Sequence, residues 1–217
     1  MSYTFSKISS YLSCPRKFKY QYIDKIKVPL KDCFKKGNAI HNILEKYRAD
    51  NQIASTIVNS FFESELGKEF KNILTNKNTK REISIGLTND FKNCSYYDKQ
   101  CFYRGRVDLV FVDDNNILNI VDYKTGKYKE ERFQDFNQLL TYALYFFNSS
   151  RIERVKLRYV YVEHCLENTL EISKDVCMST VKYISDSVNS IENDNKFMKK
   201  ISKLCDYCEF KETCDKN

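Results

Sequence analysis

Several features are scarce in this chain of 217 residues, and each scarcity narrows what the protein can be. No run approaches the roughly 18 apolar residues of a membrane-spanning helix, and no signal-peptide core follows Met1. We therefore expect a soluble, cytoplasmic protein without membrane contact. No glycine-rich phosphate loop is present, so a helicase motor would have to be a separate chain. No repeat or low-complexity linker interrupts the sequence, which indicates one domain over 1–217.

Apolar residues and positive charge are plentiful by comparison. Hydrophobic residues make up 42% of the chain and aromatic residues 14%, which is enough for a packed core. Lysine and arginine number 36 against 29 acidic residues, so the formal net charge is +7. A basic surplus of this kind favours a polyanionic partner.

The first 75 residues have the apolar spacing of helices. Ser6 is a candidate N-cap for a helix that runs to about residue 24, with a break at Pro15. Apolar residues at 40, 43, 44 and 47 predict a second amphipathic helix, and those from Val58 to Phe70 predict a third. We therefore expect a helical N-terminal part at 1–75.

The pattern changes to strands after this part. Alternation and β-branched residues predict a meander of three strands, at 82–85, 101–112 and 117–123. A strong helix at 136–147 follows, then a strand at 155–162, a short edge strand at 169–172 and a last helix at 175–192. This order predicts an α/β sandwich, with a core at 76–195 and a cysteine-rich tail at 196–217.

The most informative stretch lies inside the meander. Asp108 follows Gly105 at the start of one strand, and Asp122 and Lys124 lie at the end of the next. A hairpin turn at 115–116 would bring the two aspartates together. Residues two apart on a strand share a face, so the lysine would lie beside them. Two carboxylates and an ammonium at one strand end suit metal-assisted phosphodiester hydrolysis.

The nine cysteines suggest a second centre. Cys205, Cys208 and Cys214 fall in a tail with almost no core of its own, so a metal centre is the natural reason for its order. Cys14 is the best candidate for a fourth ligand. One distant cysteine with a three-cysteine tail favours an iron–sulfur cluster, and zinc is the alternative.

Further polar residues occur in a characteristic order. His41 follows Gly37 near the start of a helix, and Glu82 opens a strand. Gln138 and Tyr142 are four apart and share one helical face. Together with the hairpin residues and the bracketing cysteines, this order resembles the RecB-like branch of the PD-(D/E)XK nuclease superfamily.

Within that branch the chain is similar to the members with a four-cysteine iron–sulfur cluster, the AddB-type nuclease domain and the small CRISPR-associated exonuclease. The opening segment from Ser6 to Tyr20 is also similar to the start of those domains. The resemblance covers the chain from about Tyr3 to Cys214. It implies the restriction-endonuclease-like sandwich, a mixed central sheet flanked by helices.

The resemblance also implies a role for each residue. Mg²⁺ or Mn²⁺ would be held by His41, Asp108, Asp122 and the backbone carbonyl of Tyr123. Lys124 would orient the attacking water and offset charge that develops on the phosphate. Gln138 and Tyr142 would support the site and the DNA strand, and Glu82 would be an accessory acid. A [4Fe-4S] cluster would be held by Cys14, Cys205, Cys208 and Cys214.

Two basic runs interleave with aromatic residues, at 16–20 and at 127–129. Phosphate pairing combined with base stacking is how proteins grip single strands without reading sequence. We therefore expect a metal-dependent deoxyribonuclease that acts on single-stranded DNA ends in repair, recombination or CRISPR spacer acquisition. The alternatives are a non-catalytic DNA-binding subunit, or a subunit that works with a helicase or a CRISPR-adaptation partner.

Overall fold

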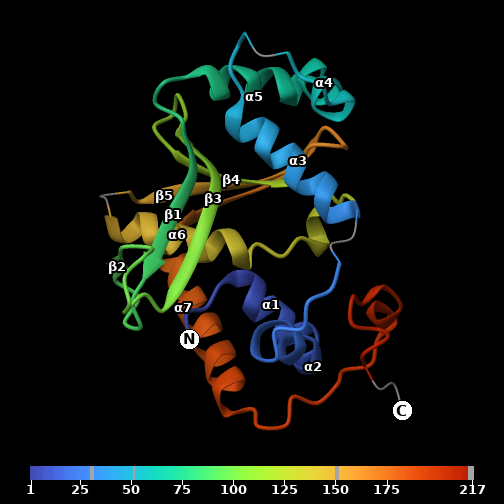
Figure 1. Ribbon diagram of the computed structural model, residues 1–217. Coiled ribbons are helices and arrows are strands. Elements are labelled where there is room, and N and C mark those ends of the chain that lie inside the picture. Colours follow the sequence, from blue (N-terminus) through green and yellow to red (C-terminus); the bar gives the residue numbers. More distant parts are fainter. Residues whose placement is uncertain (30–31, 51, 150–151, 215–217) are drawn as a thin grey trace.

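A computed structural model describes residues 1–29, 32–50, 52–149 and 152–214. Over these ranges the chain forms seven α-helices and one six-stranded sheet. Helices α3, α4 and α5 cover one face of the sheet, and α1, α2, α6 and α7 lie on the other (Figure 1). This confirms the predicted α/β sandwich.

The helices are α1 (Phe5–Ser13), α2 (Pro15–Phe18), α3 (Asp32–Lys46), α4 (Thr56–Glu63), α5 (Glu65–Thr75), α6 (Asn137–Ser149) and α7 (Lys174–Asn193). The strands are β1 (Lys80–Leu87), β2 (Asn93–Cys94), β3 (Tyr103–Val112), β4 (Leu118–Lys124), β5 (Arg154–Tyr161) and β6 (Leu166–Ser173). Their order across the sheet is β2-β1-β3-β4-β5-β6. β4 and β5 run parallel and the other neighbours antiparallel, so the sheet is mixed.

The N-terminal helices differ in detail from the prediction. Thr4, and not Ser6, caps α1, because the Thr4 side chain accepts a hydrogen bond from the Lys7 N–H. Pro15 does break the helix, and it occupies the first position of α2, where its missing N–H costs nothing. A π-helical turn at Lys19–Ile23 completes the segment.

The predicted third helix is two helices, so that expectation is wrong. The Ser64 hydroxyl accepts from Gly67 N at 3.1 Å and starts α5 afresh. Gly67 permits the sharp corner, because a Cβ there would lie 1.7 Å from the Phe61 carbonyl oxygen. Apolar periodicity alone cannot reveal such a corner, since both helices keep their apolar sides toward the same core.

The predicted hairpin and edge strand are confirmed. Val112 pairs with Leu118, and the loop between them closes through the Asp113 carboxylate, which accepts two backbone N–H groups. Asn116 has a φ of 60°, a left-handed conformation that asparagine tolerates. β6 lies at the sheet edge as expected, although with eight residues it is longer than predicted.

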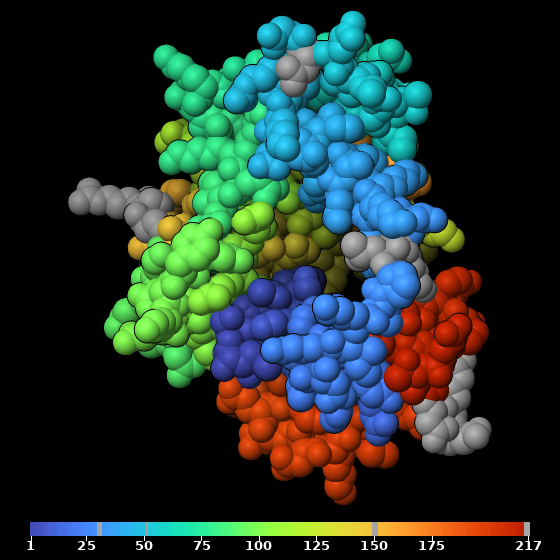
Figure 2. Space-filling model, in the orientation of Figure 1, coloured from blue at the N-terminus to red at the C-terminus, as the bar shows by residue number. Residues whose placement is uncertain are grey.

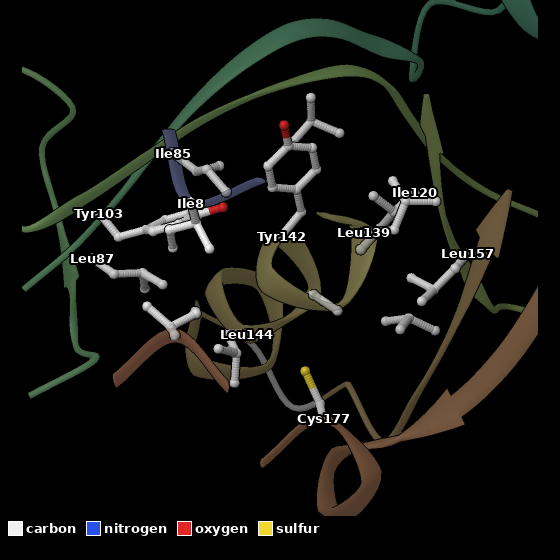
Figure 3. Packing of buried hydrophobic residues seen from close by; sticks show 14 of the residues in the cluster. Ile8, Ile85, Leu87, Tyr103, Ile120, Leu139, Tyr142, Leu144, Leu157 and Cys177 are labelled. Atoms are coloured by element: carbon white, nitrogen blue, oxygen red, sulfur yellow. The ribbon is translucent and has the colours of Figure 1, made fainter. Parts of the chain in front are cut away.

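The sheet has a separate apolar core on each face. On one face α6 packs between the strands, α1 and α7, where Tyr142, Leu139 and Ile8 are buried (Figure 3). On the other face Ile40 and Leu44 of α3 join α4 and α5 over the sheet. β4 is buried on both faces, as expected for a strand in a parallel pair. Its polar residues are therefore exceptions that need a reason.

Arg81 of β1 fixes the end of α3. Its guanidinium donates to the carbonyls of Glu45 at 2.8 Å and Tyr47 at 2.9 Å, and also to that of Leu74 at the end of α5. Carbonyls at a helix C-terminus lack intrahelical partners, and a cation suits them. Two helices are thus attached to the strand residue that precedes Glu82.

In the described part of the chain, none of the helices combines the length and apolar character needed to span a bilayer.

Candidate active site and metal centre

The site lies where β3 and β4 diverge, a region we call the fork (residues 105–108 and 122–124). The last pair of the β3–β4 hairpin is Leu109 with Val121. Beyond it, Gly105 pairs with β1 and Asp122 with β5. A fork leaves backbone groups without sheet partners, and buried backbone groups need partners of some kind. Polar side chains are therefore required at this point.

Asp108 supplies one such partner. Its Oδ2 accepts a hydrogen bond of 2.7 Å from the Tyr123 N–H on the opposite arm of the fork. The same oxygen lies 3.3 Å from His41 Nδ1, which α3 brings to the site. The imidazole also forms a hydrogen bond with the backbone of Tyr123. The structure thus brings three members of the predicted metal set together.

Glu82 reaches the same place from β1. Its neighbour Ile83 pairs with Val107, so the register puts Glu82 opposite Asp108. One ligand atom from each of His41, Glu82 and Asp108 can be chosen so that all three lie within 4.8 Å of one another. Imidazole nitrogen and carboxylate oxygens suit a divalent cation. Glu82, predicted as an accessory acid, is therefore as close to a metal position as the predicted ligands.

The backbone at Glu82 is unusual. Its φ is 50°, a conformation that costs a residue with a side chain about 1 kcal/mol or more. On one side of it Ile83 and Val107 pack toward α6, and on the other Leu109 and Arg81 face α3 and α5. At Glu82 the inward-facing residues of the β1–β3 pair therefore switch from the core beside α6 to the core beside α3 and α5. The alternating residues at 83–87 give no sign of that change in the sequence.

The electrostatics favour a bound cation. Burial raises the pKa of Glu82, and the nearby Asp108 and Glu45 carboxylates raise it further. Burial also raises the pKa of Asp122. Burial alone would lower the pKa of His41, yet its hydrogen bond and attraction to Asp108 outweigh this and raise it. Repulsion from Asp108 also contributes to the raised pKa of Glu82 and of Asp122, and a divalent cation would offset that repulsion.

A second polar group occupies the β4 arm. Lys124 Nζ lies 2.7 Å from Asp122 Oδ2 and donates to Gln138 Oε1 at 3.0 Å. Gln138 Nε2 donates in turn to Asp122 Oδ1 at 2.7 Å and to the Tyr142 hydroxyl at 3.1 Å. The ammonium also lies over the Tyr159 ring, 4.5 Å from its centroid. All the predicted polar residues of α6 and β4 thus form one network, with Asp122 almost fully buried.

Two glycines of the motifs make room for this arrangement. A Cβ at Gly105 would lie 2.6 Å from a ring carbon of Tyr142, and one at Gly37 would lie 2.9 Å from the Thr125 hydroxyl. Real Cβ contacts are not this short, so larger residues would displace α6 or α3. Gly37 lets α3 approach the end of β4, which is how His41 reaches Asp108.

A hollow opens over the fork in the space-filling view (Figure 2). Its borders are α3 above, α1 and α2 below and the strands beside it, and the chain around 120–140 lies at its base. Of these elements, α3 and the strands carry polar groups of the site.

Arg106 at this site was not among the predicted residues. Its Nε lies 3.5 Å from Glu82 Oε2, and its side chain is 58% exposed. It follows Gly105 and lies two residues before Asp108, so its place in the motif was a usable signal.

The two basic runs have different surroundings. In the first, Arg16 donates to the Phe197 carbonyl at 3.0 Å and Lys17 pairs with Glu209 at 3.1 Å. These contacts attach the C-terminal segment to α2. Arg16 and Lys17 of the first run therefore already have partners within the protein. In the second, Lys127 and Lys129 are exposed, immediately beyond the β4 arm.

The four predicted cluster cysteines are brought together. Cys14, Cys205, Cys208 and Cys214 all line one cavity of about 450 Å³ between α2 and the tail. The Lys200 N–H points at Cys14 Sγ and the Ser202 N–H at Cys205 Sγ, each at 3.4 Å. Two of the four cysteine sulfurs thus accept backbone N–H groups of the tail.

Comparison with known proteins identifies the fold. No curated protein matches the chain. The crystal structure of SSO0001 is similar over 98% of this chain and 85% of that chain, with 15% sequence identity and a TM-score of 0.49, a likeness too slight to bear on function. Residues 2–215 match the PD-(D/E)XK nuclease superfamily, whose members are typically metal-dependent nucleases. The chain belongs to the PD-(D/E)XK nuclease superfamily.

Proposed function

We propose that the protein is a metal-dependent deoxyribonuclease of the RecB-like branch that degrades single-stranded DNA from an end. The observation that carries the proposal is the group of His41, Glu82 and Asp108, whose ligand atoms lie within 4.8 Å beside the Lys124–Asp122 pair. A cation position next to a fixed ammonium is what phosphodiester hydrolysis requires.

In this proposal His41, Asp108, Asp122 and the Tyr123 carbonyl hold Mg²⁺ or Mn²⁺. Glu82 lies close enough to His41 and Asp108 to contribute a further ligand. The bound ion would polarise the phosphodiester and lower the pKa of the attacking water. Lys124 orients that water and stabilises charge on the phosphate. Its ammonium is already fixed by Asp122 and Gln138 at 2.7 and 3.0 Å, so little reorganisation is needed when substrate arrives.

The roles of Gln138 and Tyr142 follow from their hydrogen bonds. Gln138 joins Lys124 to Asp122 through its two amide atoms, so it fixes both side chains at once. Burial raises the pKa of Tyr142 well above its ordinary value, which keeps its hydroxyl neutral against Gln138. We assign both residues to positioning, without direct chemistry on the phosphate.

A single-stranded substrate is supported by the surface beyond β4. Lys127 and Lys129 are exposed on either side of Tyr128, whose hydroxyl donates to Asn168 at 3.0 Å. The loop anchored by Tyr128 offers two exposed positive charges to a flexible backbone. The action on DNA ends, and a setting in repair, recombination or CRISPR spacer acquisition with a helicase or adaptation partner, follow from the resemblance described above.

For the tail we propose a structural [4Fe-4S] cluster held by the four cysteines that line the cavity. A single tetrahedral zinc ion with Zn–S bonds of about 2.3 Å holds its sulfur atoms about 3.8 Å apart. Among the described residues, no three of these sulfurs lie within 4.8 Å of one another. The preference for a cluster over zinc rests on the pattern of one distant cysteine with a three-cysteine tail.

The test uses protein purified without oxygen and end-labelled linear and circular single-stranded DNA, with Mn²⁺ or with a chelator. Metal-dependent loss of linear DNA that vanishes in Lys124→Ala is the expected result. Cutting of circles would show endonuclease activity instead. If the wild type binds DNA and cuts neither substrate, the catalytic proposal is wrong and a DNA-binding subunit replaces it. Iron and zinc analysis of the same preparation decides between cluster and zinc.

A further inference from the structure

Arg106 is an exposed positive charge next to the candidate metal ligands His41, Glu82 and Asp108. Its side chain is 58% exposed, whereas that of Lys124 is 32% exposed and already held by Asp122 and Gln138. On β3 it follows Gly105, which faces the buried α6 side, so the guanidinium lies on the opposite, solvent side of the strand.

The contact between Arg106 and Glu82 is too weak to explain why an arginine lies at this position. The Nε–Oε2 distance is 3.5 Å, too long for a strong hydrogen bond, and ion pairs with one exposed partner contribute about 0–1 kcal/mol. Even with this arginine present, the pKa of Glu82 remains raised by burial and by Asp108. The arginine therefore interacts only weakly with Glu82.

Glu82 has a second use, since it belongs to the group that can hold a cation. A carboxylate that binds a divalent ion shares its charge with that ion and attracts a neighbouring guanidinium less. Arg106 would then be available to another anion. The anion that reaches a nuclease site together with the metal is a backbone phosphate.

We propose that Arg106 binds a backbone phosphate of the nucleic acid strand, and that it exchanges Glu82 for this phosphate when Glu82 binds the metal ion. The inference rests on the proposed nuclease function. Arg106 lies on the β3 arm of the fork and Lys127 and Lys129 lie beyond the β4 arm, so positive charge flanks the metal-ligating group on both arms. The planar guanidinium suits a phosphate through paired N–H donors.

The experiment measures binding of a fluorescent 20-nucleotide oligothymidylate by anisotropy over a range of salt concentrations, with Mn²⁺ and with EDTA. A Lys124→Ala background prevents cutting. Arg106→Gln is compared with Arg154→Gln, which removes a similarly exposed arginine (65% against 58%) from a surface pair with Glu171 in the β5–β6 pair. Arg106→Lys keeps the charge without the paired donors.

With Mn²⁺ we expect Arg106→Gln to weaken binding about tenfold. The slope of log affinity against log salt should fall by about 0.7, which is one phosphate contact to a single strand. With EDTA the loss should be less than about threefold, because the Glu82 carboxylate is then free to compete, though weakly, with the phosphate for the arginine. Arg106→Lys should retain the slope with weaker binding, and Arg154→Gln should change neither quantity.

An Arg106→Gln effect no larger than that of Arg154→Gln, or equal losses with Mn²⁺ and EDTA, would overturn the inference. So would loss of the Mn²⁺-induced rise in Tm, because Arg106 would then be a support for Glu82. A loss seen with oligothymidylate and not with oligouridylate would point to the sugar or the base methyl and overturn the phosphate assignment. If the Lys124→Ala parent binds no nucleic acid and the wild type cuts none, the proposed function itself fails.

Discussion

The fork and the cysteine tail are both candidate metal centres, and they are built in opposite ways. At the fork the polar side chains come from β1, β3, β4, α3 and α6, and the elements that hold them are packed into two apolar cores. In the tail Phe210 is buried, whereas Ile201, Leu204 and Tyr207 are 71%, 64% and 77% exposed. The fork is therefore positioned by the fold, and the tail has little apolar burial to hold it.

Because of this difference, a bound metal would have a different effect at the fork and in the tail. At the fork the carboxylates already have partners: Asp108 accepts from Tyr123 N–H, and Asp122 contacts Lys124 and Gln138. A metal there adds chemistry to a prepared site. In the tail, metal binding would supply the folding free energy that apolar burial does not. Damage to the fork should thus abolish activity without unfolding, and damage to the tail should release a segment.

The largest effect is expected for Asp108→Asn. The amide keeps an acceptor for the Tyr123 N–H and removes the charge that would hold the metal, so the fold should survive. We expect DNA cutting to fall about 10³-fold or more, with Tm within about 3 °C of wild type. Initial rates on linear single-stranded DNA and thermal denaturation measure the two. Loss of the cooperative transition in this variant would break the comparison, because the fork would then depend on its charges for folding.

The tail is tested by Cys208→Ser against Cys33→Ser, which changes an exposed cysteine outside the cavity. If a metal centre fastens the tail, Cys208→Ser should speed tryptic cleavage at the lysines of 196–203 about a hundredfold. The main thermal transition should stay close to wild type. Mass spectrometry of timed digests identifies the cut. Equal cleavage in both variants would mean that contacts such as Lys17–Glu209 are sufficient to hold the tail.

The layered fold and the hairpin that joins Asp108 to Asp122 could be predicted from sequence, because strand alternation and a turn at 115–116 are local signals. The N-cap at Thr4 and the corner at Ser64 could not be predicted, since several neighbouring residues are equally acceptable helix N-caps. Such choices are decided by packing.

For the site, residue types and order were sufficient to predict which side chains would meet. The backbone of Glu82 could not be predicted, because its φ of 50° and the change of faces beside it depend on where two strands diverge. Arg81 was missed for a similar reason: its partners are carbonyls at two helix ends that are remote in sequence. Backbone acceptors have no sequence signature.

A smaller effect on DNA cutting is expected from Gly105→Ala. This variant tests how tightly the fork packs against the core beside α6. The new methyl would lie 2.6 Å from Tyr142 and 3.0 Å from Ile85, so the Tyr142–Gln138 bond should be displaced. We expect a loss of about 2 kcal/mol in the free energy of unfolding and a clear fall in DNA cutting. Urea denaturation measures the first. Gly126→Ala is the matched control, since no heavy atom lies within 4 Å of its Cβ; similar losses in both would exclude the steric explanation.

The smallest effect is expected from Glu82→Gln, and its sign distinguishes a prepared metal site from an ordinary ion pair. The pKa of Glu82 is raised in the folded protein by burial and by Asp108, so its ionised form destabilises the fold. That cost is absent below the pKa of the unfolded chain and is complete once the pH exceeds the folded pKa. In EDTA, Glu82→Gln should therefore match wild type near pH 4 and exceed its Tm by about 2 °C at pH 7.5. With Mn²⁺ at pH 7.5 the order should reverse, because only the wild type gains the metal contact. If Glu82→Gln is the less stable protein in EDTA at pH 7.5, the pair with Arg106 outweighs the repulsion from Asp108, and the fork relies on its own charges in the way that the tail relies on its cysteines.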